Sequence, residues 1–174
     1  WSSPVDCDIT VWRKEEIVKV TIHELIHGLS YDYKQDTNDI IQHYQSKYDI
    51  TSPKMNTFEA YTEIFAELIH CYLLTKFTHE LYPSVSQCDL FSFMVSIEHQ
   101  FSQMQASKVL ELLQHEQDVN KETNVTAYYL IKTELYNDLS NFLKFCFQYN
   151  DTIIKIKDTT KYFDYLKKLK SVVK

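Results

Sequence analysis

Glycine is nearly absent from this sequence, and proline is scarce. Gly28 is the single glycine among 174 residues, and there are three prolines. These two residues are the ones that most often interrupt helices and strands. Long regular elements with few breaks are therefore expected.

Cysteine pairs and long apolar runs are missing as well. The four cysteines are widely spaced and include no CxxC pair, so neither a disulfide framework nor a cysteine zinc site is indicated. No apolar run approaches the roughly 20 residues that cross a bilayer, and no signal peptide is recognisable. We therefore expect no membrane span. The abundance of Tyr, Phe, Asn, Ile and Lys is typical of AT-rich coding DNA, and we expect a cytoplasmic protein, or one of a virion and its host cytosol.

Positive charge is in short supply over most of the chain. The net charge is −6, which disfavours nucleic-acid binding because that function draws on clustered Lys and Arg. Residues 152–174 are the exception, with seven Lys against two Asp, or +5, which leaves −11 on the rest. This Lys-rich composition favours a solvated terminal helix, and the alternative is a docking surface for an acidic partner or a membrane.

What the sequence does contain is helical periodicity. Apolar spacing predicts helices over five segments and a last one near the C-terminus: 14–29, 37–48, 54–82, 89–114, 125–149 and 161–173. Two short β-prone segments, 8–12 and 152–157, predict strands. The expected fold class is mainly α, or α+β with a minor sheet.

The first predicted helix carries the motif His23-Glu24-Leu-Ile-His27, an HExxH. Two histidines four residues apart lie on the same side of a helix, one turn above each other. Their ring nitrogens can therefore bind one zinc ion at about 2.0–2.1 Å. Glu24 lies beside the metal, where it can take a proton from a zinc-bound water. The alternative is an amphipathic helix whose histidines sit at the edge of the core.

The residues around the motif resemble those of the zincin metallopeptidases. Val20 stands three residues before the first histidine, uncharged residues surround both histidines, and Leu29 stands two residues after the second. The metzincin branch would have a Gly and a third His where this chain has Ser30 and Tyr33, so that branch is rejected. The resemblance is instead to the gluzincins, in which a later helix supplies a carboxylate ligand.

The downstream helix offers a row of glutamates at positions 59, 63 and 67. The resemblance implies that Glu59 is the third zinc ligand and that Glu63 orients a ligand histidine. A shifted assignment, with Glu63 as ligand and Glu67 behind it, stays open. His43 is an alternative ligand, and a solvated acidic stripe is the alternative to any metal site.

Peptide hydrolysis also needs a donor for the developing oxyanion. The candidates are tyrosines near the ends of the predicted helices: Tyr33, Tyr31, Tyr129 and Tyr128. Packing in the core is the alternative role for each of them.

Together these features predict a zinc-dependent metallopeptidase that acts on a peptide or protein. Residues 1–83 would form a zincin-like core with active-site helices at 14–29 and 54–82, and residues 84–174 a helical part packed onto it. The alternative is a catalytically inactive zincin-like structural or interaction protein, and a weaker one is a helical bundle without metal.

Overall fold

The computed structural model describes residues 14–115, 119 and 123–172. Within them the chain is mainly helical and has no strand, which confirms the mainly α class. None of the described helices is long and apolar enough to cross a bilayer. The elements in chain order are a 3-10 turn η1 (Lys14–Glu16), α1 (Ile17–Gly28), α2 (Asn38–Tyr48), α3 (Thr57–Leu81), α4 (Gln87–Leu112), a π-helical segment η2 (Thr126–Ile131), α5 (Lys132–Asn137), α6 (Leu139–Tyr149) and α7 (Thr159–Leu166).

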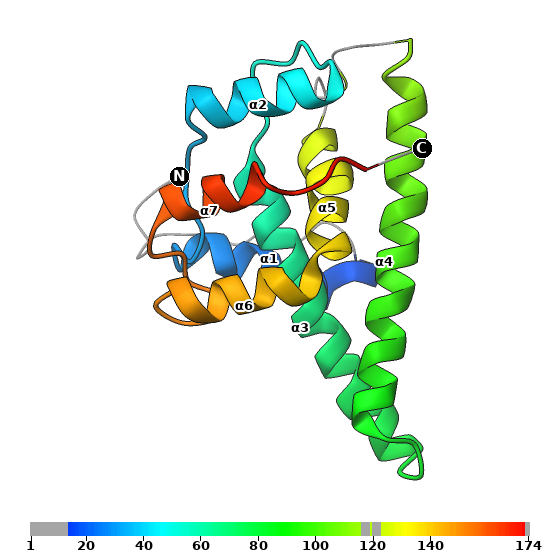
Figure 1. Ribbon diagram of the computed structural model, residues 1–174. Coiled ribbons are helices and arrows are strands. Elements are labelled where there is room, and N and C mark those ends of the chain that lie inside the picture. The colour runs from blue at the N-terminus through cyan, green and yellow to red at the C-terminus, as the bar shows by residue number, and fades with distance from the viewer. Residues whose placement is uncertain (1–13, 116–118, 120–122, 173–174) are drawn as a thin grey trace.

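Helix α3 is the centre of the molecule (Figure 1). It contacts α1, α4, η2 and α5, and in its first half Ala60, Tyr61 and Ile64 are fully buried. A helix that is covered on most sides needs apolar residues around much of its circumference. The run from position 60 to 68 meets this need, and its only charged members, Glu63 and Glu67, are buried as well.

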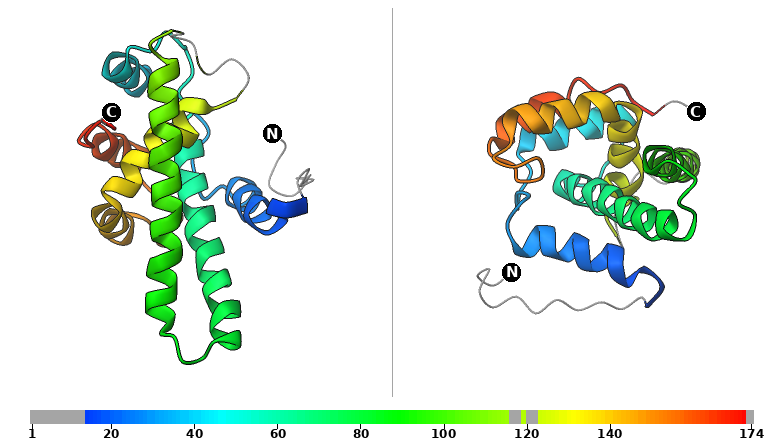
Figure 2. Two further views of the ribbon diagram at one scale, coloured as in Figure 1. Left: turned by 90° about the vertical axis from the view of Figure 1, so that its right-hand side faces the viewer. Right: turned by 90° about the horizontal axis from the view of Figure 1, so that it is seen from below.

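The helices α3 and α4 form a hairpin whose loop end projects beyond the other helices (Figure 1; Figure 2, left). At the opposite end, α1 lies across α3 on one side, while α5, α6, α7 and α2 form the rest of the body. The site described below lies where α1 crosses α3.

The predicted helix boundaries hold to within about three residues for the first four helices. The segment 125–149 was predicted as one helix and is instead divided at Asp138, where the φ of −119° leaves helical geometry. The last helix, predicted over 161–173, begins two residues earlier, after Asp158, whose side chain accepts a hydrogen bond from the backbone of Lys161. It ends at Leu166 and is therefore shorter than predicted.

The strand predicted over 152–157 is wrong. These residues form a bent loop in which the Asp151 amide donates to the Lys155 carbonyl at 3.1 Å and the Ile156 amide donates to the Tyr31 carbonyl at 2.8 Å. A β-prone segment needs a neighbouring strand to pair with, and within the described ranges it meets only helices and turns. The strand predicted over 8–12 lies outside the described residues.

Candidate metal centre

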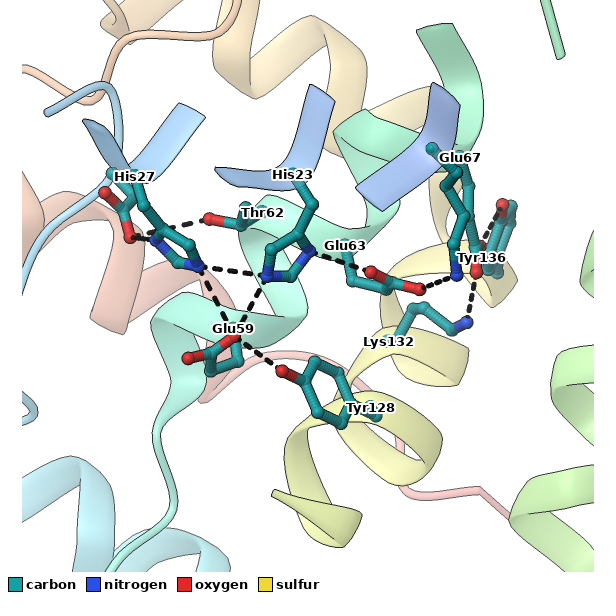
Figure 3. Close-up of polar contacts among 11 residues, drawn as sticks. His23, His27, Glu59, Thr62, Glu63, Glu67, Tyr128, Lys132 and Tyr136 are labelled. Carbon is teal, nitrogen blue, oxygen red and sulfur yellow. Dashed lines mark hydrogen bonds and ion pairs between the residues drawn. The ribbon is translucent and has the colours of Figure 1, made fainter. Parts of the chain in front are cut away.

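Helix α1 places His23 and His27 on the face that it turns towards α3 (Figure 3). Both are buried, at 8% and 7% exposure, and their ring centroids are 4.7 Å apart. The four-residue spacing is what brings the rings together, because it returns the second side chain to the same side one turn later. Their Nε2 atoms lie 3.0 Å from each other.

Helix α3 brings Glu59 to the same point. Its Oε2 lies 3.2 Å from Nε2 of His23 and 3.4 Å from Nε2 of His27. Glu59 is in the first turn of α3, and α1 crosses α3 there. The three side chains form a His-His-Glu cluster that could hold a metal ion.

The protons of the two imidazoles can be assigned from their other contacts. Nδ1 of His23 lies 2.8 Å from Oε2 of Glu63, and Nδ1 of His27 lies 2.7 Å from Oδ2 of Asp32. A carboxylate accepts hydrogen bonds only, so each Nδ1 carries the proton. In the neutral rings both Nε2 atoms then carry lone pairs, which converge on each other and on an oxygen of Glu59. Either a bound cation or protons on the rings can hold these three electron-rich atoms together.

The spacing of these atoms fits one tetrahedral ion. Two ligands that each lie about 2.0–2.1 Å from a tetrahedral zinc are about 3.3–3.4 Å apart. The observed separations of 3.0, 3.2 and 3.4 Å lie at or near that value. Two histidines and one carboxylate are also a donor set that leaves a fourth position open.

The electrostatics of the cluster show the same demand for positive charge. Burial acts to lower the pKa of both histidines. The hydrogen bonds that His23 donates to Glu59 and Glu63, and that His27 donates to Asp32 and Glu59, outweigh burial and raise the pKa of each histidine to about 9. Burial acts to raise the pKa of Glu59, yet the two histidines outweigh it and lower that pKa to about 2. Without a metal, the cluster would be held together by protons.

Asp32 is a functional candidate that the sequence reasoning did not identify. It follows α1 in a turn in which the Tyr31 amide donates to the Ile26 carbonyl at 3.0 Å and Ser30 adopts a left-handed φ of 55°. This turn brings the Asp32 carboxylate beside His27, where Thr62 also donates to Oδ2 at 3.4 Å. The signal available was an Asp five residues after the second His.

Glu63 contacts His23 through one oxygen and the ammonium of Lys19 through the other, at 2.7 Å. Burial acts to raise its pKa, but the hydrogen bond of His23 and the charge of Lys19 hold that pKa below its usual range. Glu63 therefore lies behind His23, and the oxygen nearest to both Nε2 atoms belongs to Glu59. This geometry favours Glu59 over the shifted assignment.

Glu67 lies one turn further from the cluster and has its own partners. Lys132 donates to one of its oxygens at 2.5 Å and Tyr136 to the other at 2.8 Å. Burial raises the pKa of Glu67 to about 7. The repulsion expected among the three glutamates is thus offset separately at each one, by the histidines, by Lys19 and by Lys132.

A cleft of about 470 Å³ opens beside the cluster. One wall is the face of α1 that carries His23 and Glu24, and the other includes Tyr128 and Tyr129 from η2. Glu24 is half-buried and is one of the residues that line this space. On the far side of the cluster a smaller pocket of about 140 Å³ is lined by His27, Asp32, Tyr33, Lys34, Phe58 and Glu59.

The tyrosine candidates occupy different environments. The hydroxyl of Tyr128 donates to Oε2 of Glu59 at 2.8 Å (Figure 3). Tyr129 lines the same cleft. Tyr33 instead hydrogen-bonds Thr57 and packs against Phe58, so its hydroxyl is engaged away from the ligand atoms. The residue that reaches the cluster is Tyr128, and its position on a π-helical segment is a feature common at functional sites.

The remaining candidates lie elsewhere. His43 is on α2, where its ring packs against Tyr44, and it is not part of the cluster. Within the Lys-rich C-terminal part, Lys167 pairs with Asp39 of α2. An acidic partner for this region stays a prediction.

Comparison of the chain with models of known protein families, with curated proteins and with solved structures gives no match.

Proposed function

We propose that this chain is a zinc-dependent metallopeptidase. The observation that carries the proposal is the convergence of two Nε2 lone pairs and one carboxylate oxygen, at tetrahedral ligand spacing, on the edge of a cleft. His23, His27 and Glu59 would hold the ion. Zinc bound there would lower the pKa of a coordinated water towards 7 and polarise a carbonyl group.

The other residues of the site have roles that follow from their positions. Glu24 follows the first ligand on α1 and lines the cleft, so it takes the proton of the attacking water and returns it to the leaving amine. Tyr128 lies against Glu59 and donates a hydrogen bond to the oxyanion as it forms. Glu63 and Asp32 fix the orientation of the two imidazoles.

Two measurements on the same preparations test the proposal. Elemental analysis should find one zinc per chain in the wild type and in Glu24→Gln, and much less in His23→Ala. Hydrolysis of a peptide mixture, followed by mass spectrometry, should be seen with the wild type and be lost in Glu24→Gln. Glu80→Gln, an exposed glutamate near the end of α3, serves as the matched control and should retain both properties.

The outcomes also separate the alternative function. Stoichiometric zinc without hydrolysis of any peptide would favour an inactive structural or interaction protein with a zincin-like site. A wild-type chain without zinc, whose stability His23→Ala leaves unchanged, would remove the metal site altogether.

A further inference from the structure

The hairpin of α3 and α4 projects from the body of the molecule (Figure 2, left), and it carries large apolar side chains that are exposed. On α3 they include Phe77 and Leu81, at 64% and 75% exposure, and on α4 they include Phe93 at 62%. Scattered single apolar residues are normal on a surface, but a contiguous set marks an interaction site. Six of them form what we call the apolar strip: Leu74, Phe77, Leu81, Phe93, Ile97 and Phe101.

The α3 part of the strip continues the face that carries the candidate metal centre. Glu59, Glu63 and Glu67 follow one another at four-residue spacing on the side that α1 covers. Positions 74, 77 and 81 lie seven, ten and fourteen residues after Glu67, which is the same side of a helix. This one face is therefore acidic under α1 and apolar beyond it.

The α4 part of the strip begins inside the cleft. Phe101 lines the cleft together with Glu67 and is also 49% exposed. Ile97 and Phe93 follow at successive turns towards the projecting end of the hairpin. The cleft and the apolar strip thus form one continuous surface that runs from the metal ligands along the hairpin.

The chemistry of the hairpin restricts what could bind there. Residues 70–101 contain four charged side chains, and Lys76 is the single cation among Lys and Arg. Such a surface cannot attract nucleic acid or an anionic bilayer through basic clusters. The other exposed side of α4 is polar, with small or amide side chains at Ser92, Ser96, Gln100, Gln103 and Ser107. On α4 the exposed large apolar residues of this stretch therefore lie on the side that leads to the cleft, while Tyr72 of α3 is exposed outside the strip.

We propose that the apolar strip binds an apolar segment of the polypeptide substrate, several residues away from the scissile bond. This inference rests on the proposed function, because the scissile bond fixes where the segment begins. From Glu67, which lines the cleft, to Leu74, the first residue of the strip on α3, is seven residues of helix, or about 10 Å. An extended peptide covers that length in about three residues. Apolar residues from about the fourth position onwards reach the strip.

Peptide extensions test this directly. A short peptide that the protein cleaves is extended at either end by Leu-Phe-Leu-Phe or by Ser-Gln-Ser-Gln, and kcat/KM is measured for each. We expect the apolar extension at one end to raise kcat/KM about tenfold, mainly through KM, from the burial of apolar surface. In Ile97→Ser and Phe93→Ser this gain should fall away, while the unextended peptide is cleaved at the wild-type rate. Ser96→Ala and Gln103→Ala, on the polar side of α4, should keep the gain.

Binding is measured separately from hydrolysis with fluorescein-labelled versions of the extended peptides and the Glu24→Gln protein. Strip-dependent binding without any hydrolysis by the wild type would remove the proposed peptidase and leave the docking surface. Hydrolysis that is indifferent to the extensions would overturn the docking surface and leave the peptidase. Sedimentation showing a dimer that Ile97→Ser converts to a monomer would also overturn it, because a second copy would then cover the strip.

Discussion

Nδ1 of His27 lies 2.7 Å from Oδ2 of Asp32, five residues further along the chain. The contact depends on the turn after α1, in which Ser30 is left-handed, and not on the helix that carries the histidine. It fixes the proton of His27 on Nδ1 and leaves Nε2 directed at Glu59. His27 is thus oriented by the loop that follows its own helix, whereas His23 is oriented by Glu63 from a different helix.

Replacing Asp32 should weaken metal binding without unfolding the protein. In Asp32→Asn the carboxylate that holds the His27 proton is lost, and we expect zinc affinity to fall about 10–100-fold. Competition with a chromogenic chelator measures this. Asp89→Asn, an exposed aspartate at the start of α4, is the control. Equal affinity in both variants would mean that Asp32 does not orient the ligand.

Tyr128 and Tyr129 are neighbours in the same cleft, and their removal should have different effects. The Tyr128 hydroxyl contacts Glu59, so in Tyr128→Phe we expect kcat to fall about 10²–10³-fold, the loss typical of one oxyanion donor. KM and zinc content should stay near those of the wild type. Tyr129→Phe should retain most of kcat, and the reverse ranking would transfer the role to Tyr129.

The histidine pKa values of about 9 predict how the metal-free protein responds to pH. Both values are raised above the ordinary 6.5, so the stability contributed by the protonated rings is present below pH 6.5 and is lost as pH rises through about 9. Zinc must displace those protons, so its affinity should rise with pH over the same window. Calorimetry in buffers of different ionisation enthalpy should detect proton release near neutral pH. Zinc binding with no proton release would contradict the assignment of charged histidines.

A second buried carboxylate, remote from the metal, predicts a large effect on stability. Glu134 has no exposed side-chain surface, and its Oε1 lies 2.6 Å from the ammonium of Lys47. The hydroxyl of Tyr44 donates to its other oxygen, Oε2, at 3.0 Å. Lys47→Met leaves this charge without its cation, and we expect a loss of about 3–5 kcal/mol in the free energy of unfolding. Urea unfolding measures the loss. The double variant Lys47→Met with Glu134→Gln should recover part of the lost free energy of unfolding. If the double variant loses as much as Lys47→Met alone, the loss comes from the packing of the Lys47 stem and not from its charge.

The local sequence determined the placement of the two histidines on one helix face and most of the helices, because both depend on short-range spacing. His23 and His27 lie on one face of any helix that contains them, and Glu24 follows by the same geometry. The row at positions 59, 63 and 67 was visible for the same reason. The mainly α class followed from the apolar periodicity and the scarcity of glycine and proline.

Only the tertiary structure decided which glutamate meets the histidines, because that depends on the point at which α1 crosses α3. It also decided that Tyr128 and not Tyr33 reaches the cluster, since a tyrosine in an apolar pattern can turn to the core or to the cleft. The loop at 152–157 shows the same limit: a β-prone segment becomes a strand only when another strand lies beside it. The contact of Asp32 with His27 depends on a turn of unusual φ. The apolar strip depends on which part of α3 is left uncovered by α1. Each of these is a relationship between segments distant in sequence or a backbone geometry that spacing alone does not specify.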